Sequence, residues 1–195
     1  MDAISSAVGE PKRRATYDDV LAAPEHQVAE ILDGELVLSP RPAARHACAS
    51  SAVGSKVFDA FHLEPGDPAR PGGWWILYEP ELHLGQDVVV PDLAGWRREH
   101  MPRIPDVKWF DLPPDWLCET LSPSTARIDR GRKLRIYARE AVHHVWLLDP
   151  SARTLEVLVL AGDRWSIAAV HSGSDMVRAE PFAAIELDMA RLWID

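Results

Sequence analysis

Two acidic residues stand where a charged side chain is costly unless it has a partner. Asp92 closes the apolar run 88–91, and Glu119 lies within the mostly apolar run 116–121. A carboxylate among apolar neighbours needs a cation or a hydrogen-bond donor to offset its lost hydration. Divalent ions such as Mg²⁺ take oxygen ligands, so an ion shared by both carboxylates is one interpretation. The alternative is structural, with Asp92 capping a turn and Glu119 paired with an arginine.

A candidate cation follows on the helix that the sequence predicts after Glu119. Arg130, Lys133 and Tyr137 are spaced i, i+3 and i+7, which places them on one side of a helix. Facing two carboxylates and a metal ion, the Lys133 ammonium could orient an attacking water or stabilise charge on a phosphoryl group. The competing interpretation, which spacing alone favours, is an exposed i,i+4 ion pair between Asp129 and Lys133.

The composition is that of a folded domain with an excess of acidic side chains. The chain has 195 residues, 47% hydrophobic and 26% charged, which is enough apolar material for the core of one domain. Its 30 acidic and 21 basic residues give a net charge of -9. This charge opposes broad binding to nucleic acid, which relies on lysine and arginine. A local basic patch or carboxylate-bound metal ions would have to reverse it.

The sequence predicts a cytoplasmic protein that is not bound to a membrane. Its two cysteines, Cys48 and Cys118, are too few for a disulfide framework and have no metal-ligand spacing. No apolar run is long enough to cross a bilayer, and residues 1–10 lack the basic start and apolar stretch of a signal peptide. Glycine-rich nucleotide-binding motifs and the GxSxG motif are also missing from the sequence.

The first predicted elements are a tail, a short helix and a hairpin. Residues 1–14 show no periodicity and are expected to form a flexible tail. Thr16, with an acidic residue three positions later, predicts a helix start. Asp33 and Gly34 separate two alternating runs and predict a type I′ turn, so residues 27–39 are expected to form a β-hairpin.

The hairpin has two unlike faces if Asp33 and Gly34 form its loop. One face is apolar throughout and is expected in the core: Ala29, Ile31, Leu36 and Leu38. The other face mixes acidic with apolar side chains: Glu30, Leu32, Glu35 and Val37. Such a mixture suits neither a plain core nor a plain solvent face, and it can border a cleft.

The remaining sequence alternates helices with strands. One helix is expected over residues 43–63, with the buried stripe Val53, Val57, Phe58 and Phe61. A second begins at 122–125 and runs to about 140, with the stripe Leu134, Tyr137, Ala138 and Ala141. Strands are expected over 74–84, 88–96, 116–121, 143–149, 154–160 and 164–170. Pro91 marks an edge or bulge, and 97–114 a long loop. The fold class is therefore α/β (α+β) with a central mixed sheet.

Several short motifs also occur in one order along the chain: Glu30 to Leu36 (EILDGEL), His46, Val90-Pro91-Asp92-Leu93, Glu119 to Thr125 (ETLSPST), Asp129, Lys133, Tyr137, and Val145 to Pro150 (VWLLDP). In this series the chain resembles the Uma-type family of restriction endonucleases, from about Thr16 to its end. That family is assigned to the PD-(D/E)XK superfamily. The resemblance implies a restriction-endonuclease-like mixed sheet flanked by helices, with an N-terminal β-hairpin, in a single domain over residues 15–195.

The resemblance also implies roles for individual residues. In the superfamily the two acids of the motif bind Mg²⁺, and the lysine assists the attacking water; Asp92 and Glu119 match the two acids. Leu121 stands where the motif places the lysine. The resemblance therefore suggests that Lys133 supplies the cation from the next helix. Glu30 matches an early acid that joins the metal shell.

Three functions follow as hypotheses. The first is hydrolysis of DNA phosphodiester bonds with Mg²⁺ or Mn²⁺, carried out by Asp92, Glu119 and Lys133. The second, which the acidic charge and Leu121 favour, is a binding module that kept the fold and lost efficient catalysis. The third is a phosphodiesterase acting on a small molecule. A twofold homodimer is expected, since nuclease-like domains often act as pairs on twofold DNA.

Overall fold

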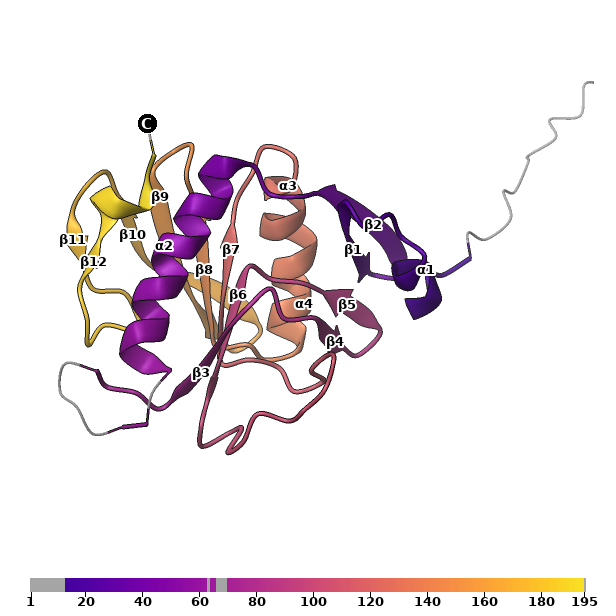
Figure 1. The fold of residues 1–195 in the computed structure, drawn as a ribbon, viewed down its shortest axis with the longest axis horizontal. Coiled ribbons are helices and arrows are strands. Elements are labelled where there is room, and N and C mark those ends of the chain that lie inside the picture. Colours follow the sequence, from indigo (N-terminus) through magenta and orange to yellow (C-terminus); the bar gives the residue numbers. More distant parts are fainter. Residues whose placement is uncertain (1–12, 63, 66–69, 195) are drawn as a thin grey trace, which may run out of the picture.

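A six-stranded mixed sheet forms the centre of the computed structural model (Figure 1), which describes residues 13–62, 64–65 and 70–194. The strand order is β10-β9-β8-β7-β6-β3. β7 and β8 are parallel, and every other neighbouring pair is antiparallel. The strands are β3 (Trp74–Tyr78), β6 (Leu93–Arg97), β7 (Trp116–Thr120), β8 (His144–Asp149), β9 (Thr154–Ala161) and β10 (Arg164–Ser172). The predicted central mixed sheet is confirmed, whereas residues 1–12 of the predicted tail lie outside the described residues.

Helices cover both faces of this sheet. α2 (Ala44–Phe61) crosses one face, and the opposite face carries a continuous helical segment made of α3 (Ala126–Ile128), the π-helical turn η1 (Asp129–Lys133) and α4 (Leu134–Arg139) (Figure 1). That segment is the crossover that two parallel strands require, and it joins β7 to β8. Side chains of β7 alternate between the two layers, with Cys118 packing on the α2 side and Leu117 on the α4 side. Glu119 therefore points toward the α4 side.

A second sheet of four short strands stands beside the first, in the order β2-β1-β5-β4. It contains β1 (Gln27–Leu32), β2 (Glu35–Pro40), β4 (Leu82–Leu84) and β5 (Asp87–Val89). Each of the two long strands expected over 74–84 and 88–96 is broken in the middle, so its halves join different sheets. The first break contains Glu79 in the left-handed region (φ 44), and the second contains Pro91. Asp92 thus lies where the two sheets meet.

The predicted hairpin is confirmed, but the assignment of its faces is wrong in part, since Ile31 is buried as expected and the two leucines of the same face are not. Leu32 pairs with Glu35 around a loop whose two residues both have positive φ, as a type I′ turn requires. Leu36 and Leu38 are 37% and 42% exposed, while Glu30 is buried. The hairpin leans out from the central sheet (Figure 1). Leu32 and Val37 of its mixed face pack against the core on the α4 side, so most of that face is the inner one.

Charged side chains hold the hairpin tip against the α4 segment. Arg132 donates to the carboxylates of Asp33 and Glu35, at 3.1 Å each, and to the backbone oxygen of Leu32. Arg135 donates to Asp33 at 3.4 Å. The hairpin that carries Glu30 is therefore fixed to the helix that carries Lys133.

The π-helical turn explains why the stripe predicted for the second helix is wrong in part. A π-helical turn widens the i→i+4 repeat to i→i+5, which rotates the residues that follow it. Tyr137 is buried as expected, but so are Ile136 and Lys133, and Ala141 lies exposed beyond the helix end. In α2 the predicted stripe is confirmed except at Phe58, which is 39% exposed and stacks on His62.

The remaining elements are small. α1 (Tyr17–Leu21) begins where expected, because the Asp19 carboxylate accepts the Thr16 amide at 2.7 Å. The C-terminal part holds β11 (Met176–Val177), β12 (Leu187–Asp188) and the 3₁₀ turn η2 (Met189–Leu192), which the sequence did not predict.

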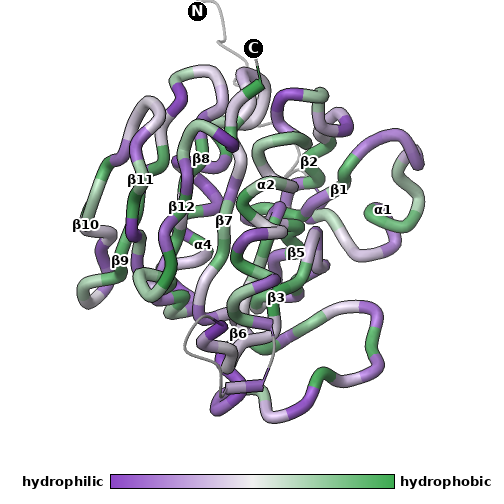
Figure 2. Tube along the Cα trace, turned by 60° about the vertical axis from the view of Figure 1, so that its left-hand side comes forward, coloured by the Kyte–Doolittle hydropathy of each residue, from purple (hydrophilic) through white to green (hydrophobic). Residues whose placement is uncertain are grey.

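Figure 2 shows hydrophobic stretches in α2 and in the central strands, and hydrophilic stretches in many connecting loops. In the part of the chain that the structure describes, no helix is long and apolar enough to cross a membrane.

The C-terminal segment completes the core on the α2 side. Phe182 is 1% exposed, and its ring contacts those of Phe61, Trp74, Trp116 and Trp146 at centroid distances of 4.6 to 5.6 Å. Aromatic rings in tilted or edge-to-face packing add to the free energy gained by burial. The segment after β10 is thus part of the folded unit.

We expect Phe182→Ala to lower the free energy of unfolding by about 3–5 kcal/mol, because it leaves a cavity among four aromatic side chains. Urea denaturation followed by tryptophan fluorescence measures this change. The control is Ile167→Ala, at a site 62% exposed on β10, which should change stability by about 0.5 kcal/mol or less. Equal effects of both substitutions would contradict the assigned role of the C-terminal segment.

Candidate active site

The central sheet brings Asp92 and Glu119 together. Leu93 pairs with Cys118 in antiparallel register, so the residues Asp92 and Glu119 come next on neighbouring strands. Asp92 is fixed to β7 directly, because its Oδ2 accepts the backbone N–H of Thr120 at 2.7 Å. Proximity of the two predicted acids follows from strand pairing alone.

Lys133 joins these acids from the opposite layer. Its Nζ lies 2.8 Å from Oε1 of Glu119, 3.1 Å from Oε1 of Glu30 and 3.8 Å from Oδ1 of Asp129. The Lys133 side chain is 3% exposed, so the alternative of an exposed Asp129–Lys133 pair is wrong. The π-helical turn begins at Asp129 and ends at Lys133, and it turns both side chains inward. Such turns occur frequently at functional sites.

Further hydrogen bonds fix the orientation of the acids. Oε1 of Glu30 accepts the backbone N–H of Val90 at 2.8 Å, which ties the hairpin to the break before Asp92. The hydroxyl of Tyr137 donates to Oε1 of Glu119. Arg130, which helical spacing placed on the same side as Lys133, instead faces outward and binds Glu156. The inner face of the helix therefore presents Lys133 and Tyr137.

Burial and neighbouring charges shift the pKa values of this group. Burial raises the pKa of Glu119 well above its usual range; Lys133 opposes the shift, and the negative charges of neighbouring acids reinforce it. Burial also raises the pKa of Asp129, against the effect of Lys133. Burial alone would lower the pKa of Lys133, but Glu119 and Glu30 outweigh it, so the pKa is raised well above its usual value. The ammonium stays charged, and it cannot neutralise all of these acids.

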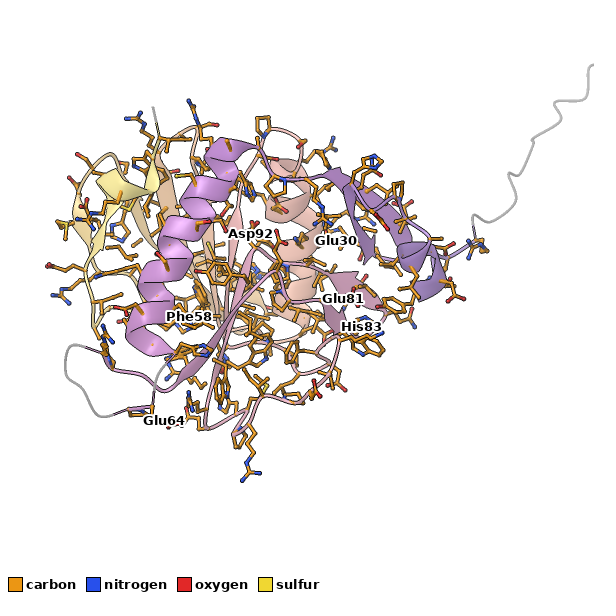
Figure 3. All side chains as sticks on the ribbon, in the orientation of Figure 1. Glu30, Phe58, Glu64, Glu81, His83 and Asp92 are labelled. Atoms are coloured by element: carbon orange, nitrogen blue, oxygen red, sulfur yellow. The ribbon has the colours of Figure 1, made fainter. Side chains whose placement is uncertain are left out.

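A pocket of about 280 Å³ opens onto this group. One wall comes from β1 and the β2–α2 link, and another from the loop between β7 and α3. Figure 3 shows Glu30 and Asp92 in the region between α2 and the hairpin. The lining includes the residues that matter here: Glu30, Arg41, His46, Asp92, Glu119 and Asp129. The mixed face of the hairpin does border a cleft.

The donor set suits a hard divalent cation. Carboxylates of Glu30, Asp92, Glu119 and Asp129 line one pocket around a single lysine, and oxygen ligands with excess negative charge are what Mg²⁺ and Mn²⁺ bind. Among the described residues, no three His, Cys, Asp or Glu side chains already form a metal cage. Three of the four acids instead contact the Lys133 ammonium, and Asp92 accepts the Thr120 backbone N–H.

Two residues of the site were not assigned a role from the sequence. Asp129 was considered only as a surface partner of Lys133, yet it is buried and lines the pocket. His46, in the first turn of α2, has Nε2 at 3.4 Å from Oδ2 of Asp92. Burial lowers the pKa of His46, but Asp92, the Thr120 backbone and Asp129 together more than offset this, so the net shift is upward. The ordered series of motifs contained both residues, but it assigned a role to neither.

Comparison with known proteins identifies the fold. The chain resembles a protein from Anabaena variabilis whose crystal structure is described as that of a "putative nuclease belonging to DUF820". The two are 21% identical; the likeness covers 91% of this chain and 97% of that chain, with a TM-score of 0.73. At this identity the likeness shows a shared fold, which confirms the predicted class. No curated protein sequence matches the chain.

A family model matches residues 15–190, nearly the whole chain and all of the residues described around the pocket. The match agrees with the order of motifs in the sequence. The chain therefore belongs to the Uma2 family, described as "putative restriction endonuclease".

Proposed function

We propose that the protein hydrolyses DNA phosphodiester bonds with Mg²⁺ or Mn²⁺. The observation that supports this most is one pocket lined by the buried Lys133 and four carboxylates, three of which lie within 3.8 Å of the Lys133 ammonium. Buried acids with an unmet need for positive charge are characteristic of functional sites. Membership of the Uma2 family supports the same reaction class.

Asp92, Glu119 and Glu30 would hold the ion. When bound, such an ion activates water and stabilises charge on the phosphoryl group and the leaving oxygen. Lys133 and Tyr137 both bind Oε1 of Glu119, and within the described residues Oε2 accepts no hydrogen bond. Glu119 can therefore keep its protein contacts through one oxygen and offer the other to the pocket. Lys133 supplies a fixed positive charge that needs no rearrangement during the reaction.

Arg41 supports a polyanionic substrate despite the net charge of -9. It lines the pocket, in the link between β2 and α2, and its guanidinium makes one described bond, to the backbone oxygen of Glu25 at 3.2 Å. An exposed arginine beside buried acids can bind a phosphate next to the one that reacts. Arg41 thus adds one exposed positive charge to the lining of a pocket that is otherwise mainly acidic.

The twofold homodimer and the cytoplasmic location stay predictions. Both cysteines are unbridged, Cys48 half-buried and Cys118 buried, as in a protein kept in a reducing compartment. Duplex DNA is twofold symmetric, and an isologous pair matches that symmetry.

We expect Asp92→Asn and Glu119→Gln each to reduce Mn²⁺-dependent nicking of supercoiled plasmid at least about 100-fold, because an amide keeps the shape and loses the charge that holds a cation. Initial nicking rates on gels give the measurement. Asp163→Asn, whose side chain is 96% exposed, is the control and should leave the rate unchanged. Unaltered nicking by both site variants would exclude these roles. If the protein cleaves a chromogenic phosphodiester but leaves the plasmid intact, its substrate is a small molecule.

Lys133→Met tests the fixed cation, since methionine keeps the length and removes the charge. We expect kcat to fall about 100-fold, as for loss of one charge-stabilising group. Without metal the variant should unfold at a lower temperature, because its acids lose their buried partner. Added Mn²⁺ should raise the melting temperature of the variant more than that of the wild type. A variant with the same kcat would refute the role of Lys133.

Arg41→Ala should weaken DNA binding and leave kcat almost unchanged. Losing one phosphate contact should reduce the slope of log affinity against log salt concentration by about 1. Fluorescence anisotropy of labelled DNA in Ca²⁺, at several salt concentrations, measures the slope. Arg164→Ala, at a side chain 90% exposed at the start of β10, is the matched control. Identical slopes for wild type and Arg41→Ala would show that Arg41 contacts no phosphate.

A further inference from the structure

We infer that His46 is a positioning residue that determines which oxygen of Asp92 is presented to the pocket. The inference rests on the proposed function, because it concerns how the site prepares Asp92 for a divalent cation. It gives α2 a role in the site, because α2 would orient the Asp92 carboxylate. Neither the pairing of β6 with β7 nor the contacts of Lys133 provide that orientation.

The two oxygens of Asp92 have unlike surroundings. Oδ2 accepts the Thr120 backbone N–H at 2.7 Å and faces Nε2 of His46 at 3.4 Å. Within residues 13–62, 64–65 and 70–194, Oδ1 accepts no hydrogen bond. The Thr120 amide of β7 binds this oxygen, and the His46 ring lies against the same oxygen from α2. Contacts from two elements restrict rotation of the carboxylate more than the Thr120 amide alone would.

The position of His46 is set by a rigid element. It lies in the first turn of α2, and its side chain is 12% exposed. Ala49, Val53 and Val57 follow on the same helix, each fully buried against the central sheet. The helix therefore delivers the imidazole to Asp92 with little freedom.

The edge of the His46 ring that carries Nε2 faces Asp92. Its Nε2 contacts that carboxylate, and the Thr120 backbone is also close enough to affect the His46 pKa. Nδ1 is buried without a partner among the described residues. Of the two ring nitrogens, Nε2 is therefore the one that can act on Asp92.

This placement is what an outer-shell residue does at a metal site. A group that hydrogen-bonds a ligating carboxylate orients it, and removing such a group typically costs about 10–100-fold in metal affinity. The volume of the ring and its donor atom are separable by substitution. His46→Leu keeps most of the volume without a donor, whereas His46→Gln can place an amide N–H close to the position of Nε2.

Calorimetric titration of the full chain with Mn²⁺ alone tests the inference. We expect the Kd of His46→Leu to rise about 10–100-fold, and that of His46→Gln to stay within about threefold of the wild type. His143→Ala, at an exposed histidine immediately before β8, is the matched control and should bind like the wild type. In the nuclease assay His46→Leu should lower kcat with an unchanged KM for DNA.

The outcomes separate the inference from the proposed function. Equal Mn²⁺ affinity of His46→Leu and wild type would overturn the inference and leave the function standing. A loss in His46→Gln as large as that in His46→Leu would also overturn it, because donation would then not be what matters. If His46→Leu does not fold, the affinity of His46→Gln decides on its own. No Mn²⁺ binding by the wild type would overturn the metal-dependent function, and the inference with it.

Discussion

The structure around the pocket depends on one buried ammonium. Lys133 is in contact with Glu119 of the central sheet and with Glu30 of the hairpin, and it lies near Asp129 of its own helix. Each of these charges loses hydration in the fold, a cost that mutual attraction offsets only while all partners are present. The cluster therefore joins three separately formed elements. Its composition, with more acids than cations, leaves the negative charge that a divalent ion would neutralise.

Two local departures from regular structure make this cluster possible. The break before β6, marked by Pro91, ends one sheet and begins another, so Asp92 faces the space between them. The π-helical turn moves Lys133 and Asp129 to the inner side of a helix whose flanking residues continue as an ordinary α-helix. Irregular backbone is concentrated at the pocket, where regular hydrogen bonding would have turned these side chains elsewhere.

Sequence reasoning could find the acids but not their full surroundings. Asp92 and Glu119 terminate or interrupt apolar strands, and that local conflict is visible in residue types alone. The hairpin turn was equally visible, since Asp33-Gly34 has a specific backbone requirement. The inner face of the hairpin depended on a second sheet that forms only by long-range pairing. The burial of Lys133 depended on one widened helical turn, which carries no residue pattern of its own.

The contacts at the hairpin tip have a consequence for how the site is assembled. Asp92 and Glu119 are set by backbone pairing in the central sheet, which dissolved salt affects little. Glu30 is carried by a hairpin whose tip is held by Arg132 and Arg135 through partly exposed ion pairs, and counterions weaken such pairs. Ionic strength therefore acts on the hairpin tip before it acts on the fold, while Glu30 itself keeps the Val90 N–H and the buried Lys133 ammonium.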